Sequence, residues 1–461
     1  MSQYYERKSS SRAAGIIILA AIAAVIAILF AALTYYGTAP EEEGIRNGED
    51  LLAHIEATPV DDSVTTLCDA LLTWELPGYY GNLLAAVEDC YVKYYYKDLP
   101  PASELATEAA KIFAINYYDD CDKDDIDEVT YALIDSYIAA IGDPYSYFRT
   151  AEEFEDYSTD LSGVFAGIGV YVEMNIDNGL IRVIRTIPGS PAEEAGIKGG
   201  DLIIGVDGFS VAEIGYQTAL DLVKGVVGTS VTVTVSRGNE TIDFTMQRAT
   251  VVEQSVTYEL TEDKIALITI TSFKGNTAGQ FAAAIDAAES DGAVGIIFDL
   301  RSNPGGYVFA ICDSLSYLVP SGTPIASFSS DRVSEYAVHG TEIEPEDHVL
   351  SLPCVVICNE YTASAGELFT AAMRDYNEMG LIDCTLVGHT TYKKGIMQSS
   401  LTFSTGATLT LTTAYYNPPL GVNYDGIGVV PHVVLAPDAE EGLYLTTAQN
   451  ELNKLLADNE D

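Results

Sequence analysis

The sequence predicts a multidomain α/β (α+β) protein with an N-terminal transmembrane helix, a helical region, a small β-rich domain and a larger α/β core. Three observations predict this order. A nearly unbroken apolar run comes first, apolar residues at helical spacing follow, and short strand patterns then give way to alternating strands and helices. The length of 461 residues suits about two to four domains.

The apolar run from Ala14 to Tyr35 has the roughly 20 residues that a helix needs to cross a bilayer. Basic residues precede it and Glu41 to Glu43 follow it, so the positive-inside rule places the bulk of the chain outside the cytoplasm. We therefore predict a cytoplasmic segment (1–13), a single-pass anchor in the cell membrane (14–35) and a tether (36–80). A cleaved signal peptide is the alternative.

Composition narrows the possible partners. Acidic residues outnumber basic ones by 68 to 23, which gives a net charge of −45 and argues against nucleic-acid binding. The cysteines form no C-x-x-C pair and no histidine has metal-ligand spacing, so we expect no metal and no cofactor. If the N-terminal region is extracellular, Cys68, Cys90 and Cys121 are candidates for a disulfide.

Residues 81–160 are predicted to form the helical region. The segment from Leu83 to Phe148 has a mostly helical pattern, which Pro100 and Pro101 interrupt. It ends in the turn signal D-P-Y-S-Y-F, from Asp143 to Phe148.

Residues 161–250 are predicted to form the β-rich domain. Strand candidates at Val170–Met174 and Leu202–Val206 flank Gly-rich turns, and a helix candidate covers Tyr216–Val223. A Gly-rich turn can present several N–H groups to a carboxylate, and the adjoining strand edge can pair with an extended peptide. The alternative is that these glycines only make a tight turn. The predicted peptide-binding loop is Gly167, Ile168, Gly169 and Val170.

Residues 251–461 are predicted to form the α/β core, because strand and helix patterns alternate from Val251 onward. The buried strand candidate Ala293–Leu300 leads into R-S-N-P-G-G. Gly305 and Gly306 lack a Cβ there, so their backbone can approach another group closely.

The stretch from Asn359 to Gln398 holds the candidate chemistry. Ser364 stands where an apolar strand candidate passes into a helical pattern, and the N–H groups at a helix start favour negative charge. If residues 394–398 form a strand, Lys394 and Gln398 share one face. Each residue also has a structural explanation, because Ser364 with Glu367 fits a capping box and polar side chains on strands are usually solvated.

Together these motifs resemble the carboxy-terminal processing peptidases, also called tail-specific proteases. The family segments N-E-x-S-A-S-A-S-E, F-G-K-G-S-V-Q and L-R-x-N-P-G-G resemble Asn359–Glu367, Tyr392–Gln398 and Leu300–Gly306. The pattern S-P-A-x-x-A-G-I-x-x-G-D at Ser190–Asp201 resembles that of a PDZ domain. This chain departs from the family at two positions, where glycine replaces serine at 366 and lysine replaces glycine at 393.

The resemblance implies that Ser364 is the nucleophile, Lys394 the general base and Gln398 the residue that orients the lysine. A serine hydroxyl needs a base, and no histidine is placed to act as one. A lysine can act only when neutral, which requires its pKa to fall by roughly three units, and burial shifts it in that direction. The resemblance also implies an oxyanion hole formed by N–H groups of Ala365 and of Gly305 or Gly306.

The expected function is that of a membrane-anchored extracytoplasmic serine endopeptidase. Its PDZ domain would bind the C-terminal tails of protein or peptide substrates, which the Ser–Lys dyad would cleave at or near those tails. The oligomeric state stays open. The alternative is a catalytically inactive scaffold that binds peptides through the PDZ domain.

Overall fold

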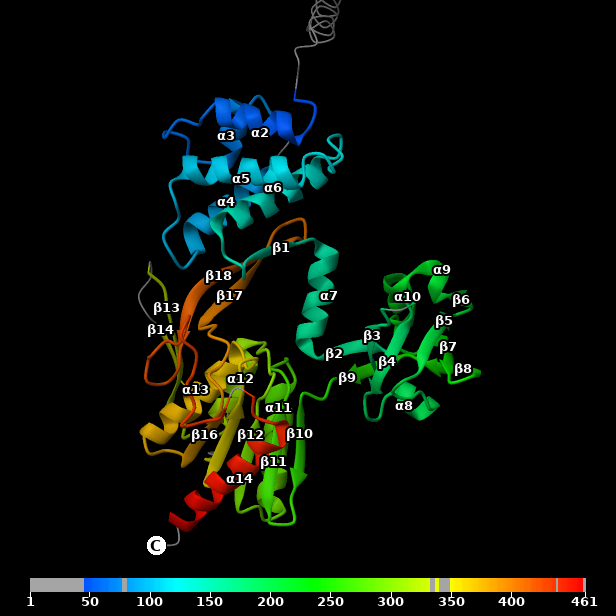
Figure 1. Ribbon diagram of the computed structural model, residues 1–461, viewed down its shortest axis with the longest axis vertical. Coiled ribbons are helices and arrows are strands. Elements are labelled where there is room, and N and C mark those ends of the chain that lie inside the picture. Colours follow the sequence, from blue (N-terminus) through cyan, green and yellow to red (C-terminus); the bar gives the residue numbers. More distant parts are fainter. Residues whose placement is uncertain are drawn as a thin grey trace, which may run out of the picture. The chain divides into compact units, whose positions relative to one another are not determined.

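The computed structural model describes residues 45–76, 81–176, 178–331, 336–339, 349–436 and 438–458 (Figure 1). The predicted anchor, residues 14–35, lies outside these ranges. No helix inside them combines the length and the apolar character that crossing a membrane requires. The chain divides into two compact units, one with residues up to Gly81 and Pro101–Ala140, the other with Asn82–Pro100 and Ile141–Asp461.

The first unit is helical. Side chains that accept N–H groups begin two of its helices: Asn47 accepts from Asp50 at 2.8 Å, and Thr66 accepts from Asp69 at 3.0 Å. The indole of Trp74 is fully buried and donates to the Thr58 carbonyl. The helices described in this unit are α2 (Gly48–Ala57), α3 (Leu67–Thr73), α5 (Ala102–Asn116) and α6 (Ile126–Ile141).

In the second unit, a core sheet has the order β10-β11-β12-β15-β16-β19. From β11 onward neighbouring strands are parallel, and both faces are covered: α11, α12 and α13 pack on one, α14 on the other (Figure 1). This double cover explains the continuous apolar strands. The elements are β10 (Val256–Leu260), β11 (Ile265–Ile270), α11 (Thr277–Ser290), β12 (Gly295–Asp299), α12 (Val308–Ser316), β15 (Cys354–Cys358), α13 (Ala365–Glu378), β16 (Cys384–Gly388), β19 (Val433–Val434) and α14 (Glu441–Asp458).

A second sheet of this unit has β18 at its centre, paired with β1, β13 and β17, while β14 pairs with β13. The chain enters it after α4 (Asn82–Tyr94), and the Tyr96 N–H donates to the carbonyl of Thr412 in β18. Its strands are β1 (Tyr147–Arg149), β13 (Pro324–Ser329), β14 (Tyr336–His339), β17 (Ile396–Thr402) and β18 (Thr408–Asn417).

The β-rich part is built on strands in the order β3-β4-β5-β7-β8, with β6 on β5. Buried valine and isoleucine side chains from these strands form its core. Asp201 is buried and binds the Arg237 guanidinium through both oxygens, at 2.6 Å each. Its elements are β3 (Val170–Met174), β4 (Ile181–Thr186), α8 (Pro191–Ala195), β5 (Leu202–Val206), β6 (Phe209–Ser210), α9 (Val211–Ile214), α10 (Tyr216–Val223), β7 (Ser230–Arg237) and β8 (Glu240–Gln247).

Two linkers lead into and out of the β-rich part. The helix α7 (Ala151–Ser162) begins with a capping box of Thr150 and Glu153 and leads into β2 (Val164–Gly167). The return segment is β9 (Ala249–Val252), which pairs with β2 in antiparallel register. The entry and exit of the β-rich part are therefore hydrogen-bonded to each other.

Two expectations need correction. Lys394 does not lie on a strand, because β17 begins at Ile396 and a bulge between Met397 and Gln398 breaks its alternation. Among the residues that the structure describes, no disulfide joins the cysteines, so the pairing considered for the N-terminal region is not formed.

Candidate active site

Ser364 lies on a strained turn between β15 and α13. Its φ of 54° and ψ of −119° fall in a region that non-glycine residues rarely adopt. Such a conformation costs about 1–3 kcal/mol and persists where the surrounding structure imposes it. A strained strand-to-helix turn is also how other hydrolases present a nucleophilic serine. The Ser364 side chain is partly exposed, whereas the next residue, Ala365, is buried.

The Glu367 carboxylate joins the serine turn to the lysine loop. It is fully buried in the first turn of α13. Its Oε2 accepts the N–H groups of Ser364 at 2.9 Å and Lys394 at 2.8 Å. Its Oε1 accepts the Lys393 N–H and the Thr391 hydroxyl, both at 2.6 Å. Burial raises the pKa of Glu367, and these four hydrogen bonds oppose the rise.

The sequence predicts Glu367 only as a capping partner of Ser364. That half of the prediction holds, because the carboxylate accepts the Ser364 N–H. Its hydrogen bonds to the loop at Thr391–Lys394 were missed. Glu367 and that loop are too far apart in sequence for a local pattern to relate them.

The Lys394 side chain points toward Gln398. The amine donates to Gln398 Oε1 at 3.0 Å, and Gln398 Nε2 donates to Thr412 Oγ1 at 3.1 Å. The amine also lies 4.4 Å from the centre of the Tyr145 ring. In the described part of the chain, no hydrogen bond joins Lys394 Nζ to the Ser364 hydroxyl.

The charge state of Lys394 reflects competing effects. Burial lowers its pKa, while the carboxylates of Asp143, Glu367 and Asp425 oppose that fall. The direction is the one that a general base requires. Since burial is the larger effect, the amine loses its proton more readily than that of a solvated lysine.

Two buried tyrosines donate hydrogen bonds to the backbone carbonyls of Lys394 and Ser364. The Tyr416 hydroxyl donates to the Lys394 carbonyl at 3.0 Å, and the Tyr424 hydroxyl donates to the Ser364 carbonyl at 3.5 Å. Their rings meet edge to face with centres 5.9 Å apart. Burial raises the pKa of Tyr416, and hydrogen bonding to the Ser364 side chain opposes this. Sequence reasoning missed both residues.

The Gly305–Gly306 turn lies directly against the serine turn. Both follow neighbouring parallel strands, β12 and β15, so they meet at the carboxyl edge of the sheet. Gly305 has φ +95°, and a Cβ there would lie 2.7 Å from both Ser364 Cβ and Ala365 N. Only glycine allows this approach.

The N–H groups around Ser364 differ in what they bind. Gly305 donates to Asn303 Oδ1 at 2.8 Å, so its N–H is already occupied. The N–H groups of Gly306 and Ala365 have no acceptor among the described residues. Asn303 is fully buried and also accepts the Ala363 N–H through its carbonyl, at 2.8 Å.

The two departures from the family pattern differ in how well they suit their surroundings. Lys393 has φ +85°, a conformation that favours glycine, the residue that the family has there. At Gly366, an added Cβ would lie 3.1 Å from Asn303 O and 3.2 Å from Thr362 Cγ2. A serine would fit there only if these neighbours moved by a few tenths of an ångström.

Comparison with known proteins identifies the two parts of the chain. Residues 264–435 match the family model of Peptidase family S41, and residues 182–237 match that of a PDZ domain. Residues 264–435 therefore form a domain of peptidase family S41.

Similar proteins include the "Probable CtpA-like serine protease" of Staphylococcus aureus (strain COL) and that of Staphylococcus epidermidis (strain ATCC 12228 / FDA PCI 1200). Each is 32% identical over 325 residues, which cover 70% of this S41 chain and 63% of the relative. The chain thus spans just under two thirds of the length of these relatives.

Two solved structures are similar to this S41 chain. The photosystem II D1 C-terminal processing protease is 23% identical with a TM-score of 0.46, covering 78% of this chain and 94% of that one. A putative S41 protease from Bacteroides fragilis NCTC 9343 is 17% identical with a TM-score of 0.48, covering 80% and 96%.

The predicted peptide-binding loop of the PDZ domain is held through its carbonyls. Ala192 N–H donates to Ile168 O, and Ile187 N–H donates to Gly169 O, both at 2.9 Å. The N–H groups of Ile168 and Gly169 find no acceptor within the described ranges. Gly169 has φ +80°, and Val170 begins β3, which is an edge strand. A free edge and free N–H groups suit strand addition by a peptide.

The loop after β11 binds both linkers of the PDZ domain through ion pairs and hydrogen bonds. Lys274 forms ion pairs with Asp160 and Glu253, at 2.8 Å each. Asn276 Nδ2 donates to the carbonyls of Gly163 and Glu253, at 3.2 and 3.0 Å. The linkers are therefore attached to the peptidase core through this loop.

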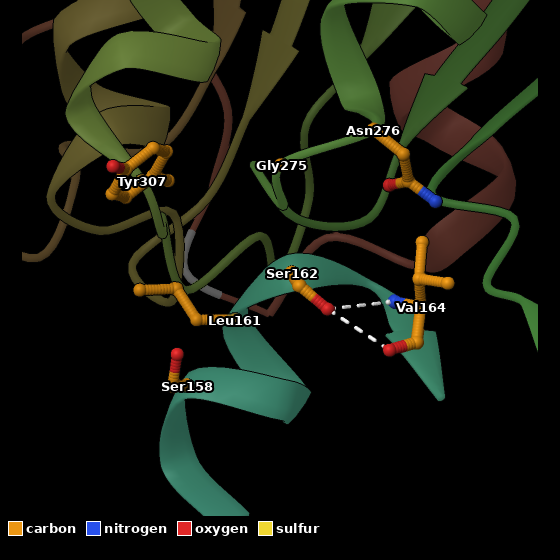
Figure 2. Close-up of a pocket in the computed structure, with 7 residues that line it drawn as sticks. All are labelled: Ser158, Leu161, Ser162, Val164, Gly275, Asn276 and Tyr307. Atoms are coloured by element: carbon orange, nitrogen blue, oxygen red, sulfur yellow. Dashed lines mark hydrogen bonds between the residues drawn. The ribbon is translucent and has the colours of Figure 1, made fainter. Parts of the chain in front are cut away.

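A cavity of about 420 Å³ lies beside this attachment (Figure 2). At one side the Ser162 hydroxyl bonds both the N–H and the carbonyl of Val164, at 3.0 Å. Tyr307, at another side, directly follows Gly306, and its N–H donates to Phe273 O. The cavity thus adjoins both a PDZ linker and the glycine turn. Its lining residues are Ser158, Leu161, Ser162, Val164, Gly275, Asn276 and Tyr307.

Proposed function

We propose that this chain is a membrane-anchored extracytoplasmic serine endopeptidase that cleaves protein substrates at or near their C-terminal tails. The observation that carries the proposal is the shared oxygen of Glu367, which holds the N–H groups of Ser364 and Lys394. Their two backbone nitrogens lie within two hydrogen-bond lengths of each other. The membrane anchor rests on the apolar run Ala14–Tyr35 alone.

In this mechanism the neutral Lys394 amine takes the proton of the Ser364 hydroxyl as the oxygen attacks the carbonyl carbon of the scissile peptide. The ammonium then gives the proton to the leaving amine, and the C–N bond breaks. Lys394 then takes a proton from a water molecule, which attacks the ester on Ser364. This step releases the carboxylic acid product and restores the Ser364 hydroxyl. Gln398 directs the lysine through its hydrogen bond to Nζ.

The amine must turn from Gln398 toward the serine before the first step. The lysine stem can rotate about its side-chain bonds, which gives the amine other positions to adopt. Burial supports the neutral form that the step needs, because it lowers the pKa of Lys394.

We assign the oxyanion hole to the N–H groups of Ala365 and Gly306. Gly305 serves instead as the point of close contact, because its N–H is bound to Asn303. Removing one such donor in another hydrolase costs about 3–4 kcal/mol of transition-state stabilisation.

The PDZ domain is proposed to hold the substrate tail. The N–H groups of Ile168 and Gly169, which have no acceptor among the described residues, suit the terminal carboxylate, and the β3 edge from Val170 suits the tail backbone. Gly167 ends β2, so the loop begins at the linker pair itself.

The deciding experiment compares Ser364→Ala and Lys394→Ala with the unaltered chain on a protein that has an unstructured C-terminal tail. Both variants should fold normally by circular dichroism and lose cleavage by at least 1,000-fold, on the order expected for a missing nucleophile or base. Lys393→Ala is the matched control, since it removes the neighbouring lysine and should keep cleavage. Full cleavage by either test variant would reject the dyad.

The alternative function is an inactive scaffold that binds tails through the PDZ domain. One observation favours it: among the described residues, the Lys394 amine bonds Gln398 and not Ser364. A fluorophosphonate probe separates the two functions. Labelling at Ser364 that disappears in Lys394→Ala supports the peptidase, whereas tail binding without labelling supports the scaffold.

A further inference from the structure

The Tyr145 ring is the aromatic contact of the lysine amine. The ring centre lies 4.4 Å from Lys394 Nζ, a distance at which a ring face attracts a cation. Tyr145 is partly buried. Its hydroxyl interacts with that of Tyr392, and burial raises the pKa of Tyr145, so the phenol stays neutral.

The turn that carries Tyr145 is fixed by its own hydrogen bonds. Asp143 accepts the Tyr145 N–H at 3.0 Å and the Ser146 hydroxyl at 2.6 Å. The Ser146 oxygen in turn accepts the N–H of Thr412 in β18 at 3.0 Å. The ring is therefore anchored to the strand beside the lysine loop.

These contacts form a closed ring of interactions that begins and ends at the Lys394 amine. Lys394 bonds Gln398, and Gln398 bonds the Thr412 hydroxyl. The backbone of Thr412 bonds Ser146, whose turn presents Tyr145 back to the amine. The two contacts of the amine, an amide oxygen and a ring face, thus rest on the same residue of β18.

The surroundings of the Lys394 amine have opposing effects on its charged form. Burial disfavours the ammonium, while the carboxylates of Asp143, Glu367 and Asp425 favour it. The face of the Tyr145 ring also favours the ammonium, because its quadrupole attracts positive charge. The Tyr145 ring therefore opposes loss of the proton from Lys394, although the proposed reaction requires the neutral amine.

We propose that Tyr145 is a positioning residue that holds the Lys394 amine in its charged form beside Gln398, away from the Ser364 hydroxyl. This inference rests on the proposed function, since it names what restrains the base of that reaction. Tyr145 acts through Lys394 and does not touch the substrate. The resting enzyme is held below its full activity until the amine leaves the ring.

The test uses the variant Tyr145→Leu, which keeps apolar bulk and removes the ring. The midpoint of the acid limb of the kcat/KM profile should shift to lower pH by about half a unit to one unit. At a fixed pH on that limb, kcat/KM should therefore rise by about three- to tenfold. Tyr145→Phe keeps the ring and should leave the limb in place. Tyr147→Leu makes the same replacement two residues away, at a ring that contacts Arg149, and should also leave it in place.

A second readout does not need activity. In full-length Ser364→Ala, trace acetylation of Lys394 by acetic anhydride is followed against pH by mass spectrometry, and Tyr145→Leu should lower the midpoint by the same amount. An unchanged or raised midpoint overturns the positioning role. If the midpoint falls but the unaltered chain cleaves no tail at any pH, the ring contact stands and the proposed function fails.

Discussion

The N–H groups of Ser364 and Lys394 donate to the same Glu367 oxygen, at 2.9 and 2.8 Å. One buried carboxylate thus sets the spacing of the proposed nucleophile and base. The remaining oxygen of Glu367 holds the loop just before the lysine. Substituting this single residue should therefore disturb both partners of the dyad at once.

Glu367→Gln should impair both activity and stability. A glutamine has one acceptor oxygen, so two of the four donors lose their partner, at about 1–3 kcal/mol each when buried. We expect cleavage to fall by at least 100-fold and the free energy of unfolding in urea to drop by about 2–4 kcal/mol. Glu378→Gln, at the exposed end of α13, is the control and should change neither. Equal stability of the two variants would contradict the bridging role.

Lys393→Gly should be more stable than Lys393→Ala by about 1 kcal/mol. The φ of +85° strains any side chain with a Cβ, and glycine relieves that strain at some cost in chain entropy. Urea unfolding of the two variants measures the difference. Cleavage by both should stay near that of the unaltered chain, because neither changes Lys394. A more stable alanine variant would mean that the turn is not strained.

Lys394 should make stability depend on pH. Its folded-state pKa is lowered by burial, so the unfolded chain binds more protons between that lowered value and the ordinary value near ~10.4. Stability relative to Lys394→Met should therefore rise as pH increases through this window and be lowest below it. Urea unfolding across pH tests this slope. A difference that falls with rising pH would show that the lysine has a raised pKa.

The same lowered pKa should shape the activity profile. The value of kcat/KM should fall on the acid side as Lys394 becomes protonated, with a midpoint below that of a solvated lysine. A profile without an acid limb above pH 5 would show that another group is the base.

Deleting residues 165–249 should slow cleavage of tailed proteins more than that of short peptides. The ends of the cut lie close together, because β2 and β9 pair from Val164 with Val252 onward. In the proposed function the PDZ domain is the second attachment of a long substrate, so its loss should also remove the high effective concentration of the tail. Kinetics on both substrate types measure the ratio, and identical losses would reject a tail-holding role.

Local patterns predicted much of the fold. The strands Val170–Met174 and Leu202–Val206 and the helix Tyr216–Val223 are confirmed with the predicted bounds. Their periodicity follows from which face each segment buries, and that information is local to the segment. The predicted strand at Lys394 was wrong, because a positive φ at Lys393 and a bulge at Gln398 interrupt the pattern.

The candidate site was also predicted only in part from the sequence. Sequence motifs indicated Ser364, Lys394 and Gln398, but not Glu367 as a bridge or Tyr145 as the ring over the amine. Spacing along the chain carries no record of these contacts, because each joins segments that only the packed sheets bring together.

By itself, the sequence predicted the order of the elements that the structure describes, the two domain types and the residues proposed for the chemistry, because these depend on local periodicity and on short motifs. Only the tertiary structure decided which donors stay unoccupied, which carboxylate joins the two loops and where the lysine amine rests. Those outcomes depend on burial and on hydrogen bonds between residues that are distant in the chain.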